Sequence, residues 1–221
     1  MGFISMLIGQ CKQPRGWMGK LLTQGMNRAH GPMTDWALTK IPIHDQRHVL
    51  DIGCGGGATL LKLAGLLPEA EIHGIDYSPV SLRVAARKSR HLIGQGRIFI
   101  REASVSHLPY QDTCFDLAVA IESHYFWPNL QEDLLEIRRV MRFGGTLVLA
   151  GGVYFGGKFD SRNRKLAAHG RMNCQTLVEL REAIRGAGYI NISVHEEQDK
   201  GWFCVAGCKS PDRAVGVSPS A

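Results

Sequence analysis

An aspartate followed closely by several glycines stands near residue 50 of the sequence. In the stretch HVLDIGCGGGAT, residues 48–59, Asp51 lies two positions before Gly53, and further glycines follow at residues 55–57. Glycines at this spacing allow a tight turn and the close approach of a ligand to the backbone. The stretch therefore predicts a loop that binds a nucleoside-containing ligand, with a negative charge beside it.

Two classes of cofactor remain open on spacing alone. Residues 53–58 satisfy the GxGxxA pattern of dinucleotide-binding loops, and Asp76 follows at about the 20-residue spacing of an acid that binds a ribose. A carboxylate at Asp51 would repel a pyrophosphate, whereas it would attract an ammonium or a sulfonium. S-adenosylmethionine carries both of these cations and a ribose but no phosphate. The charge pattern therefore favours S-adenosylmethionine over NAD(P).

The elements that must position this loop alternate along the chain. Short apolar runs predict strands at residues 47–52, 70–76, 96–102, 115–121 and 145–151. Helices are predicted between them at residues 58–67, 78–92 and 129–141. Strands that alternate with helices indicate a doubly wound sheet whose ligands bind at the carboxyl ends of the strands.

The last part of the alternating pattern predicts an antiparallel ending. After a helix at residues 174–188, strand-like runs at 189–195 and 201–207 are separated only by EEQDK and a turn. Because so short a connection cannot hold a crossover helix, the two strands are expected to form a hairpin. The predicted fold class is α/β, with a doubly wound, seven-stranded, mainly parallel sheet and a C-terminal antiparallel hairpin.

Composition indicates one domain with a packed core. The 221 residues are 44% hydrophobic and 21% charged, which is ordinary for a globular protein. Apolar runs fall short of the roughly 20 residues that span a bilayer, and the first residues lack the features of a signal peptide. We expect a cytoplasmic protein with reduced cysteines, no metal site and no membrane contact.

Four motifs occur in the order found in a known enzyme family. VLDIGCGGG, GIDYS, LPYQDTCFDLAVA and EIRRVMRFGGTLVLAG resemble the motifs of class I S-adenosylmethionine-dependent methyltransferases, particularly the group with quinone and sterol methyltransferases. The resemblance implies a Rossmann-like methyltransferase domain at residues 46–209. It also implies a helical lid at residues 1–45, for which helices are predicted at about 17–29 and 32–40. Residues 210–221 are predicted to be a disordered tail.

The resemblance implies a cofactor site around the glycine loop. The loop residues against the methionine moiety and ribose would be Asp51, Gly53, Cys54, Gly55 and Gly57. Asp76 would accept hydrogen bonds from both ribose hydroxyls, with Tyr77 and Ser78 beside the adenine. Ser104 and Val105 stand where many relatives carry an Asp-Ala pair for the adenine amino group. A serine hydroxyl gives a weaker bond there than a carboxylate.

The segment IESHYFWPN, after the fourth predicted strand, is expected to face the methyl group and the acceptor. Glu122 would lie at the methyl end of the cofactor. His124 and Tyr125 are the candidate catalytic residues, with His124 as a possible base, although methyl transfer from a sulfonium often needs only alignment. Phe126 and Trp127 are expected to pack beneath the next helix.

Contacts with the acceptor are expected from the lid and from two loops. The candidate substrate-binding residues are Asn27, His30, Trp36 and Tyr125. The glycine-rich segment at residues 151–165 is predicted to be a mobile loop that covers the acceptor.

Three functions follow from these patterns. The favoured function is methyl transfer from S-adenosylmethionine to a small molecule by in-line displacement, which leaves S-adenosylhomocysteine. The formal charge of +6 and the basic stretches at residues 83–97 and 161–165 suggest RNA, DNA or protein as alternative substrates. Against nucleic acid, the fourth strand ends in ESHY instead of an Asn/Asp-Pro-Pro-aromatic motif. The third candidate is an NAD(P)-dependent oxidoreductase. The acceptor atom and the oligomeric state are not determined by the sequence.

Overall fold

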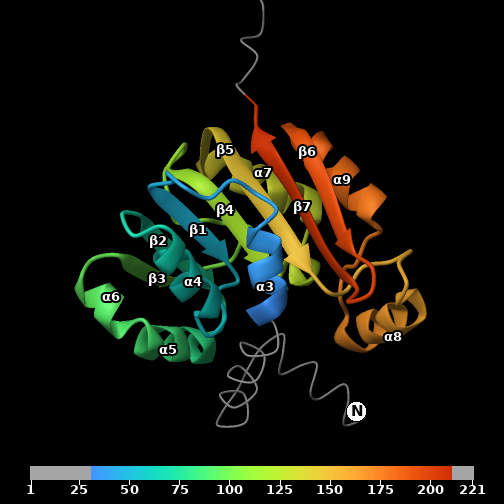
Figure 1. Ribbon diagram of the computed structural model, residues 1–221, viewed down its shortest axis with the longest axis horizontal. Helices are drawn as coiled ribbons and strands as arrows, with labels where there is room; N and C mark the ends of the chain where they lie inside the picture. Colours follow the sequence, from blue (N-terminus) through green and yellow to red (C-terminus); the bar gives the residue numbers. More distant parts are fainter. Residues whose placement is uncertain (1–30, 211–221) are drawn as a thin grey trace, which may run out of the picture.

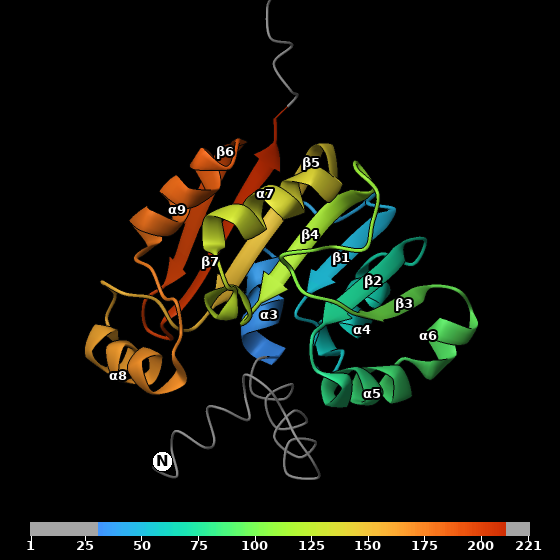
Figure 2. The same ribbon diagram turned by 180° about the vertical axis from the view of Figure 1, so that it is seen from behind.

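A seven-stranded sheet runs through the protein, with helices on both faces (Figures 1 and 2). The computed structural model describes residues 31–210. The strands are β1 (His48–Ile52), β2 (Glu71–Asp76), β3 (Ile98–Glu102), β4 (Phe115–Ile121), β5 (Met141–Gly151), β6 (Tyr189–Glu197) and β7 (Trp202–Lys209). The helices are α3 (Gly31–Leu38), α4 (Ala58–Leu66), α5 (Pro79–Lys88), α6 (Arg90–Gly94), α7 (Leu130–Val140), α8 (Asp160–Gly170) and α9 (Leu177–Gly186), with a short 3-10 turn η1 (His124–Phe126).

The strand order is β3-β2-β1-β4-β5-β7-β6. Strands β1 to β5 pair in parallel, and β7 lies antiparallel between β5 and β6. The fold class and the closing hairpin predicted from the sequence are therefore confirmed. From β1 the chain continues to β2 and β3 on one side, and it then crosses to β4 on the other side of β1. The connections that follow β1 and β4 therefore run in opposite directions, which opens a crevice at the carboxyl ends of these two strands.

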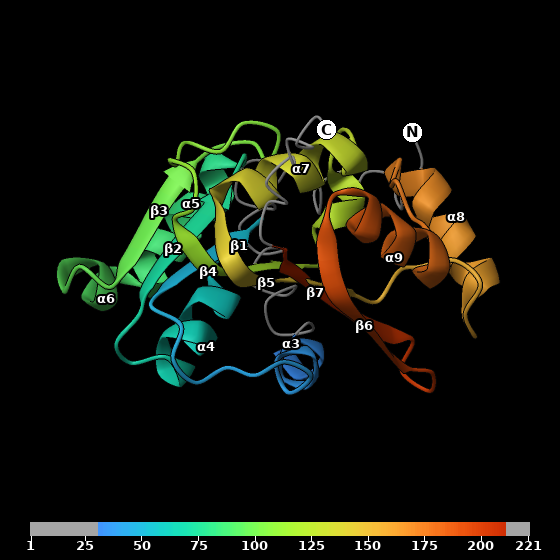
Figure 3. The same cartoon turned by 90° about the horizontal axis from the view of Figure 1, so that it is seen from above.

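Two apolar layers hold the helices against the sheet. On one face, Met33 of α3 and Leu60 of α4 pack with alternate residues of the central strands, and on the other face Leu134 of α7 and Leu180 of α9 do so. Figure 3 shows α3 and α4 on the opposite side of the sheet from α7 and α9. The central strands are buried on both faces, as expected for a parallel sheet. No helix in residues 31–210 is long and apolar enough to cross a membrane.

Two predicted boundaries are wrong, and a third prediction is not tested. The helix predicted at residues 78–92 is interrupted at Ser89, whose backbone is not helical, so that α5 and α6 are separate. Strand β5 begins at Met141, because a register shift against β4 accommodates the glycines that suggested a later start. The predicted helix at residues 17–29 lies outside the described part of the chain.

The segment expected to be a mobile loop contains helix α8. Asp160 accepts a hydrogen bond from the Gly156 amide at 2.7 Å and pairs with Arg164 one turn later. The buried Asn163 donates to the Tyr154 carbonyl oxygen at 2.9 Å, which attaches the helix to the end of β5. These polar contacts hold α8 in place. The helix has few apolar residues, so packing of an apolar face contributes little.

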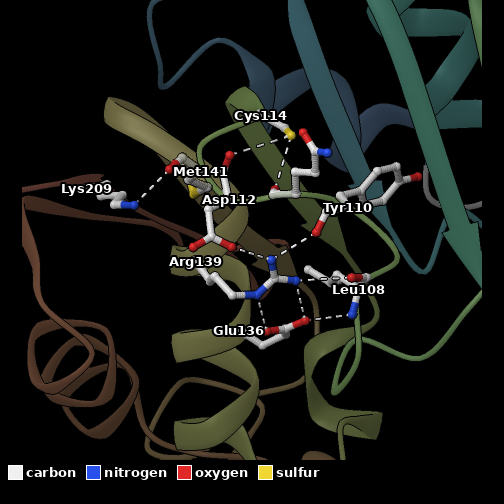
Figure 4. Close-up of polar contacts among 9 residues, drawn as sticks. Leu108, Tyr110, Asp112, Cys114, Glu136, Arg139, Met141 and Lys209 are labelled. Atoms are coloured by element: carbon white, nitrogen blue, oxygen red, sulfur yellow. Dashed lines mark hydrogen bonds and ion pairs between the residues drawn. The ribbon is translucent and has the colours of Figure 1, made fainter.

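A guanidinium holds the loop that connects β3 to β4 (Figure 4). Arg139 of α7 donates to the carbonyl oxygens of Tyr110 at 2.9 Å and Leu108 at 3.1 Å. It also pairs with Glu136 at 2.8 Å and Asp112 at 2.7 Å, and these carboxylates raise the pKa of the guanidinium. Because Glu136 in turn accepts from the Leu108 amide at 2.7 Å, the loop is fixed to α7 at several points.

Replacement of Arg139 by leucine is expected to loosen this loop. The substitution removes the charged donor that two carbonyl oxygens and two carboxylates share, so the free energy of unfolding should fall by about 2 kcal/mol. Arg185→Leu is the matched control, because it removes only an exposed pair with Glu182 and should cost about 0.5 kcal/mol or less. Urea unfolding of both variants measures the difference, and equal losses would contradict the assignment.

Candidate active site

A cavity of about 790 Å³ opens at the carboxyl ends of β1, β2 and β4. Its size lies within the range of roughly 300–1,000 Å³ that is usual for small-molecule sites. The walls come from residues 52–56, 75–77, 103–105, 121–123, 125–128 and 171–173, with Gly31 and Thr34 of α3. The cavity therefore lies at the crevice that the strand order creates.

The glycine loop is locked between β1, β2 and β4. Gly53 has a φ of +76°, and a Cβ at this position would lie only 2.6 Å from the Cβ of Ser123. The amides of Gly53 and Cys54 both donate to the Ile75 carbonyl oxygen at 2.9 Å. Ser123 donates its hydroxyl to the Ile52 carbonyl oxygen at 2.7 Å. A side chain at Gly53 would push the loop away from β4, so glycine is required here.

The start of α4 faces the same cavity without a side-chain cap. Gly57 is the N-cap residue in a left-handed conformation, and it offers no side-chain acceptor to the first turn. Ala58 and Thr59 of this turn line the cavity, although Gly57 itself does not. Because the first amides of a helix lack partners within the helix, this end of α4 can bind an anionic group of a ligand.

Asp76 presents a carboxylate to the cavity from the end of β2. It accepts hydrogen bonds from the amides of Gly55 at 2.9 Å and Ser78 at 2.8 Å. Burial raises the pKa of Asp76, and these two bonds partly offset the effect. Tyr77 lines the cavity next to it, whereas the buried Ser78 caps α5 and does not line the cavity. Of these residues, Asp76 and Tyr77 are placed to touch a ligand.

Asp51 lies behind the lining and not in it. Its side chain is 1% exposed, and its Oδ2 atom has no hydrogen-bond partner among residues 31–210. Burial, followed by repulsion from Asp76, raises the pKa of Asp51 to about 8. Two buried carboxylates near each other and near an open cavity favour a ligand that brings positive charge.

Ser104 and Val105 line the cavity on the β3 side. They precede the loop that Arg139 fixes, so their position depends on α7 as well as on β3. The Ser104 hydroxyl oxygen accepts from the Ser106 amide at 3.2 Å. Serine therefore supplies a local turn here in addition to facing the cavity.

Another part of the lining, after β4, contains a glutamate and a tyrosine that contact each other. Glu122 has a φ of +55°, which is uncommon for a residue other than glycine and often marks functional sites. Its carboxylate accepts from the Gly152 amide at 2.5 Å and from the hydroxyl of Tyr125. Both residues line the cavity, together with Phe126 and Trp127. Phe126 and Trp127 were expected only to pack beneath the next helix, and in the structure they also line the cavity.

The structure contradicts the assignment of His124 as a base. His124 is 3% exposed, does not line the cavity and packs against the rings of Tyr125, Trp127 and Phe203. Burial lowers its pKa to about 3, which keeps the imidazole neutral. The 3-10 turn η1 rotates the His124 side chain into the core while its neighbours face the cavity.

The lid contributes less of the predicted site than expected. Trp36 does not line the cavity, because it packs against Trp202 at a ring distance of 6.1 Å, with Lys40 over its face. A substrate contact by Trp36 is therefore contradicted. Asn27 and His30 lie outside the described residues. From α3, Gly31 and Thr34 reach the cavity instead.

Several lining residues were missed by the sequence analysis. Arg171, Met172 and Asn173 follow α8 and line the cavity, where the Asn173 amide donates to the Tyr125 carbonyl oxygen at 2.7 Å. Arg171 has a φ of +49° and ends the helix. Because α8 was not predicted, no sequence signal placed its last turn near the site. Lys62 of α4 also lines the cavity and pairs with Asp35 of α3.

Comparison with known proteins assigns this arrangement to a family. Residues 43–200 match a family model described as a methyltransferase domain. The chain belongs to this methyltransferase family. The family predicted from the four motifs is therefore confirmed.

The relatives of this methyltransferase include longer proteins. The sterol 4-C-methyltransferase strm-1 of Caenorhabditis elegans is 29% identical over 136 residues, which are 62% of this chain and 39% of the relative. The demethylmenaquinone methyltransferase of Lactiplantibacillus plantarum is 30% identical over 132 residues, which are 59% of this chain and 54% of the relative. The matched region thus spans about half or less of each relative.

A solved structure shows the same fold over nearly the whole methyltransferase. It is a putative methyltransferase in complex with the Haloferax volcanii Trm112 methyltransferase activator, with a TM-score of 0.74 and 19% identity. The match covers 96% of this chain and 99% of that one. At this identity the likeness establishes the fold.

Replacement of Asp76 by alanine is expected to weaken cofactor binding. The Kd for S-adenosylhomocysteine, measured by calorimetric titration, should rise at least about tenfold, the scale of a lost pair of charge-assisted hydrogen bonds. Asp199→Asn is the control, because it removes a carboxylate that pairs with Lys158 at the exposed turn before β7. Unchanged affinity in the folded Asp76→Ala protein would refute the site.

The raised pKa of Asp51 predicts a pH-dependent stability difference. Aspartates in the unfolded chain titrate near pH 3.9, so between about pH 4 and 8 the native state retains a proton that the unfolded state has lost. This contribution to stability falls as the pH rises. Asp51→Asn removes this contribution. The free energy of unfolding of the variant, relative to that of the wild type, should therefore rise by up to about 1.4 kcal/mol per pH unit between about pH 4 and 8.

Urea unfolding of the two cofactor-free proteins between about pH 5 and 9 measures this difference. The opposing effect of His124, whose lowered pKa favours the native state as the pH rises, is common to both proteins and cancels. The gain should level off above about pH 8. A difference that does not change with pH would show that Asp51 is ionised in the folded protein.

Proposed function

We propose that this methyltransferase transfers the methyl group of S-adenosylmethionine to a small-molecule acceptor by in-line displacement and leaves S-adenosylhomocysteine. The observation that carries the proposal is the arrangement of the cavity at the crevice. One part of its lining is the glycine loop and Asp76, and another part, after β4, is Glu122 and Tyr125. A cofactor site and an acceptor site thus share one space, as direct transfer between two bound molecules requires.

The residues of the first part of the lining fit a nucleoside with a cationic amino-acid part. Asp76 would accept the ribose hydroxyls, and the uncapped start of α4 would receive the carboxylate. Tyr77, Ser104 and Val105 would surround the adenine. The buried Asp51 favours the positive charge of the ammonium and the sulfonium from behind the loop. When bound, S-adenosylmethionine supplies an electrophilic methyl carbon on a positively charged sulfur.

The residues of the second part of the lining would orient the acceptor and keep water out. Phe126 and Trp127 provide apolar surface, and residues 171–173, after α8, also line the cavity. Glu122 and Tyr125 are the titratable groups of this part, so they replace His124 as the groups that would hold or accept an acceptor proton. Glu122 is held in place by the Gly152 amide.

Several features support a small molecule rather than a polymer as the acceptor. The cavity is lined by residues of α3 and by residues 171–173 in addition to the strand ends. The matched relatives are named for a sterol and for demethylmenaquinone. We further propose that residues 46–209 are the methyltransferase domain and that residues 1–45 act as a lid, since Gly31 and Thr34 line the cavity. We propose a cytoplasmic location.

Calorimetric titration with S-adenosylhomocysteine and, separately, with NADP tests the proposal. We expect binding of the first and none of the second, because the Asp76 carboxylate disfavours the phosphates of NADP. Binding of NADP alone would overturn the proposal. Turnover against a library of small metabolites, with release of S-adenosylhomocysteine as the readout, would then identify the acceptor. Methylation of RNA or protein substrates in its place would favour the alternative function.

A further inference from the structure

The edge strand β3 carries a second hollow, which shares no lining residue with the cofactor cavity. A groove of about 550 Å³ runs between β3 and the helices α5 and α6. Figure 2 shows β3 at the outer edge of the sheet with both helices beside it. Its lining consists of six apolar side chains and two arginines, without a carboxylate: Leu82, Arg83, Ala86, Ile93, Ile98, Phe99, Ile100 and Arg101.

The backbone of β3 is open on the side of this groove. The Arg97 carbonyl oxygen accepts from the Ile72 amide, and the Ala103 amide donates to the Asp76 carbonyl oxygen, so these two residues turn toward β2. Because backbone groups alternate along a strand, the amides and carbonyls of Ile98, Ile100 and Glu102 point to the open side. No strand among residues 31–210 pairs with that side. The edge is therefore a template for one more strand.

The surroundings of the groove select the charge of its occupant. Arg83 is exposed on the groove wall, and Arg87 and Arg90 are exposed on the same pair of helices. Arg101 donates to the Pro109 carbonyl oxygen and lies over the Tyr110 ring, which fixes its cation near the edge. The acidic group at this edge is Glu102, at the end of the strand. A second copy of the same basic edge would be repelled, whereas an acidic segment would be attracted.

Two large apolar side chains remain partly uncovered at the same place. Ile93 and Phe99 are each 38% exposed, on opposite sides of the open strand edge. A strand added to β3 would cover them with its alternating side chains, as in β-strand addition to other sheets. We propose that the β3 edge binds an extended, acidic segment of a partner protein, which pairs with Ile98, Ile100 and Glu102.

A peptide of alternating valine and glutamate, labelled with fluorescein, is the probe, and the same peptide with lysine in place of glutamate is its control. Fluorescence anisotropy with the full chain should show saturable binding of the acidic peptide and at least tenfold weaker binding of the basic one. Absence of acidic-peptide binding, or equal binding of both peptides, would overturn the proposal.

Two variants locate the binding. Ile100→Pro removes an outward amide without removing a bond to β2, and it should raise the peptide Kd at least tenfold. Arg83→Glu should do the same, whereas Arg87→Glu, outside the groove lining, should change the Kd less than threefold. Retained affinity for S-adenosylhomocysteine shows that each variant is folded. Equal effects of the two arginine variants would indicate general charge attraction and refute the groove.

Competing occupants give different results. If size-exclusion chromatography with light scattering shows a dimer that Ile100→Pro dissociates, a second copy of the chain occupies the edge and the proposal is wrong. If Arg83→Glu abolishes binding of single-stranded RNA while the acidic peptide does not bind, the groove serves nucleic acid and the proposal is equally wrong. Failure of either kind leaves the proposed methyl transfer untouched, because the groove is separate from the cofactor cavity.

Discussion

The close approach of Gly53 to Ser123 is the contact on which the site depends. At this point the two halves of the sheet meet, and a single added carbon would force β1 and β4 apart. The contact fixes the position of the glycine loop, at the end of β1, relative to the Glu122 segment, at the end of β4. Each part of the lining is thereby placed relative to the other, before any ligand binds.

The charges of the cavity carry a cost in the absence of ligand. Asp51 is buried without a full set of partners, and Asp76 is also held at a raised pKa. Such groups reduce stability at neutral pH, since the unfolded chain would expose them as solvated carboxylates. A ligand that supplies positive charge offsets part of this cost. The two carboxylates thus lower the stability of the ligand-free protein and favour a nucleoside that carries positive charge.

The parts of the site that sequence reasoning placed well are those fixed by backbone chemistry. The glycine loop and Asp76 at the end of β2 follow from strand ends and turn residues, which a sequence expresses locally. Ser104 after β3 was placed by the family resemblance. His124 was misplaced because a 3-10 turn reverses which side chain faces the cavity, and adjacent residues give no signal of that rotation. Helix α8 was missed because buried Asn163 and the Asp160–Arg164 pair hold it, in place of an apolar stripe.

The bond between the segment after α8 and Tyr125 has a consequence for substitution in the cavity lining. The Asn173 amide donates to the Tyr125 carbonyl oxygen, and this main-chain contact places no demand on side-chain identity except that proline is excluded. Met172, which also lines the cavity, can therefore change while the attachment persists. The lining of the cavity at this point can thus vary in side-chain chemistry without loss of the main-chain bond that holds it.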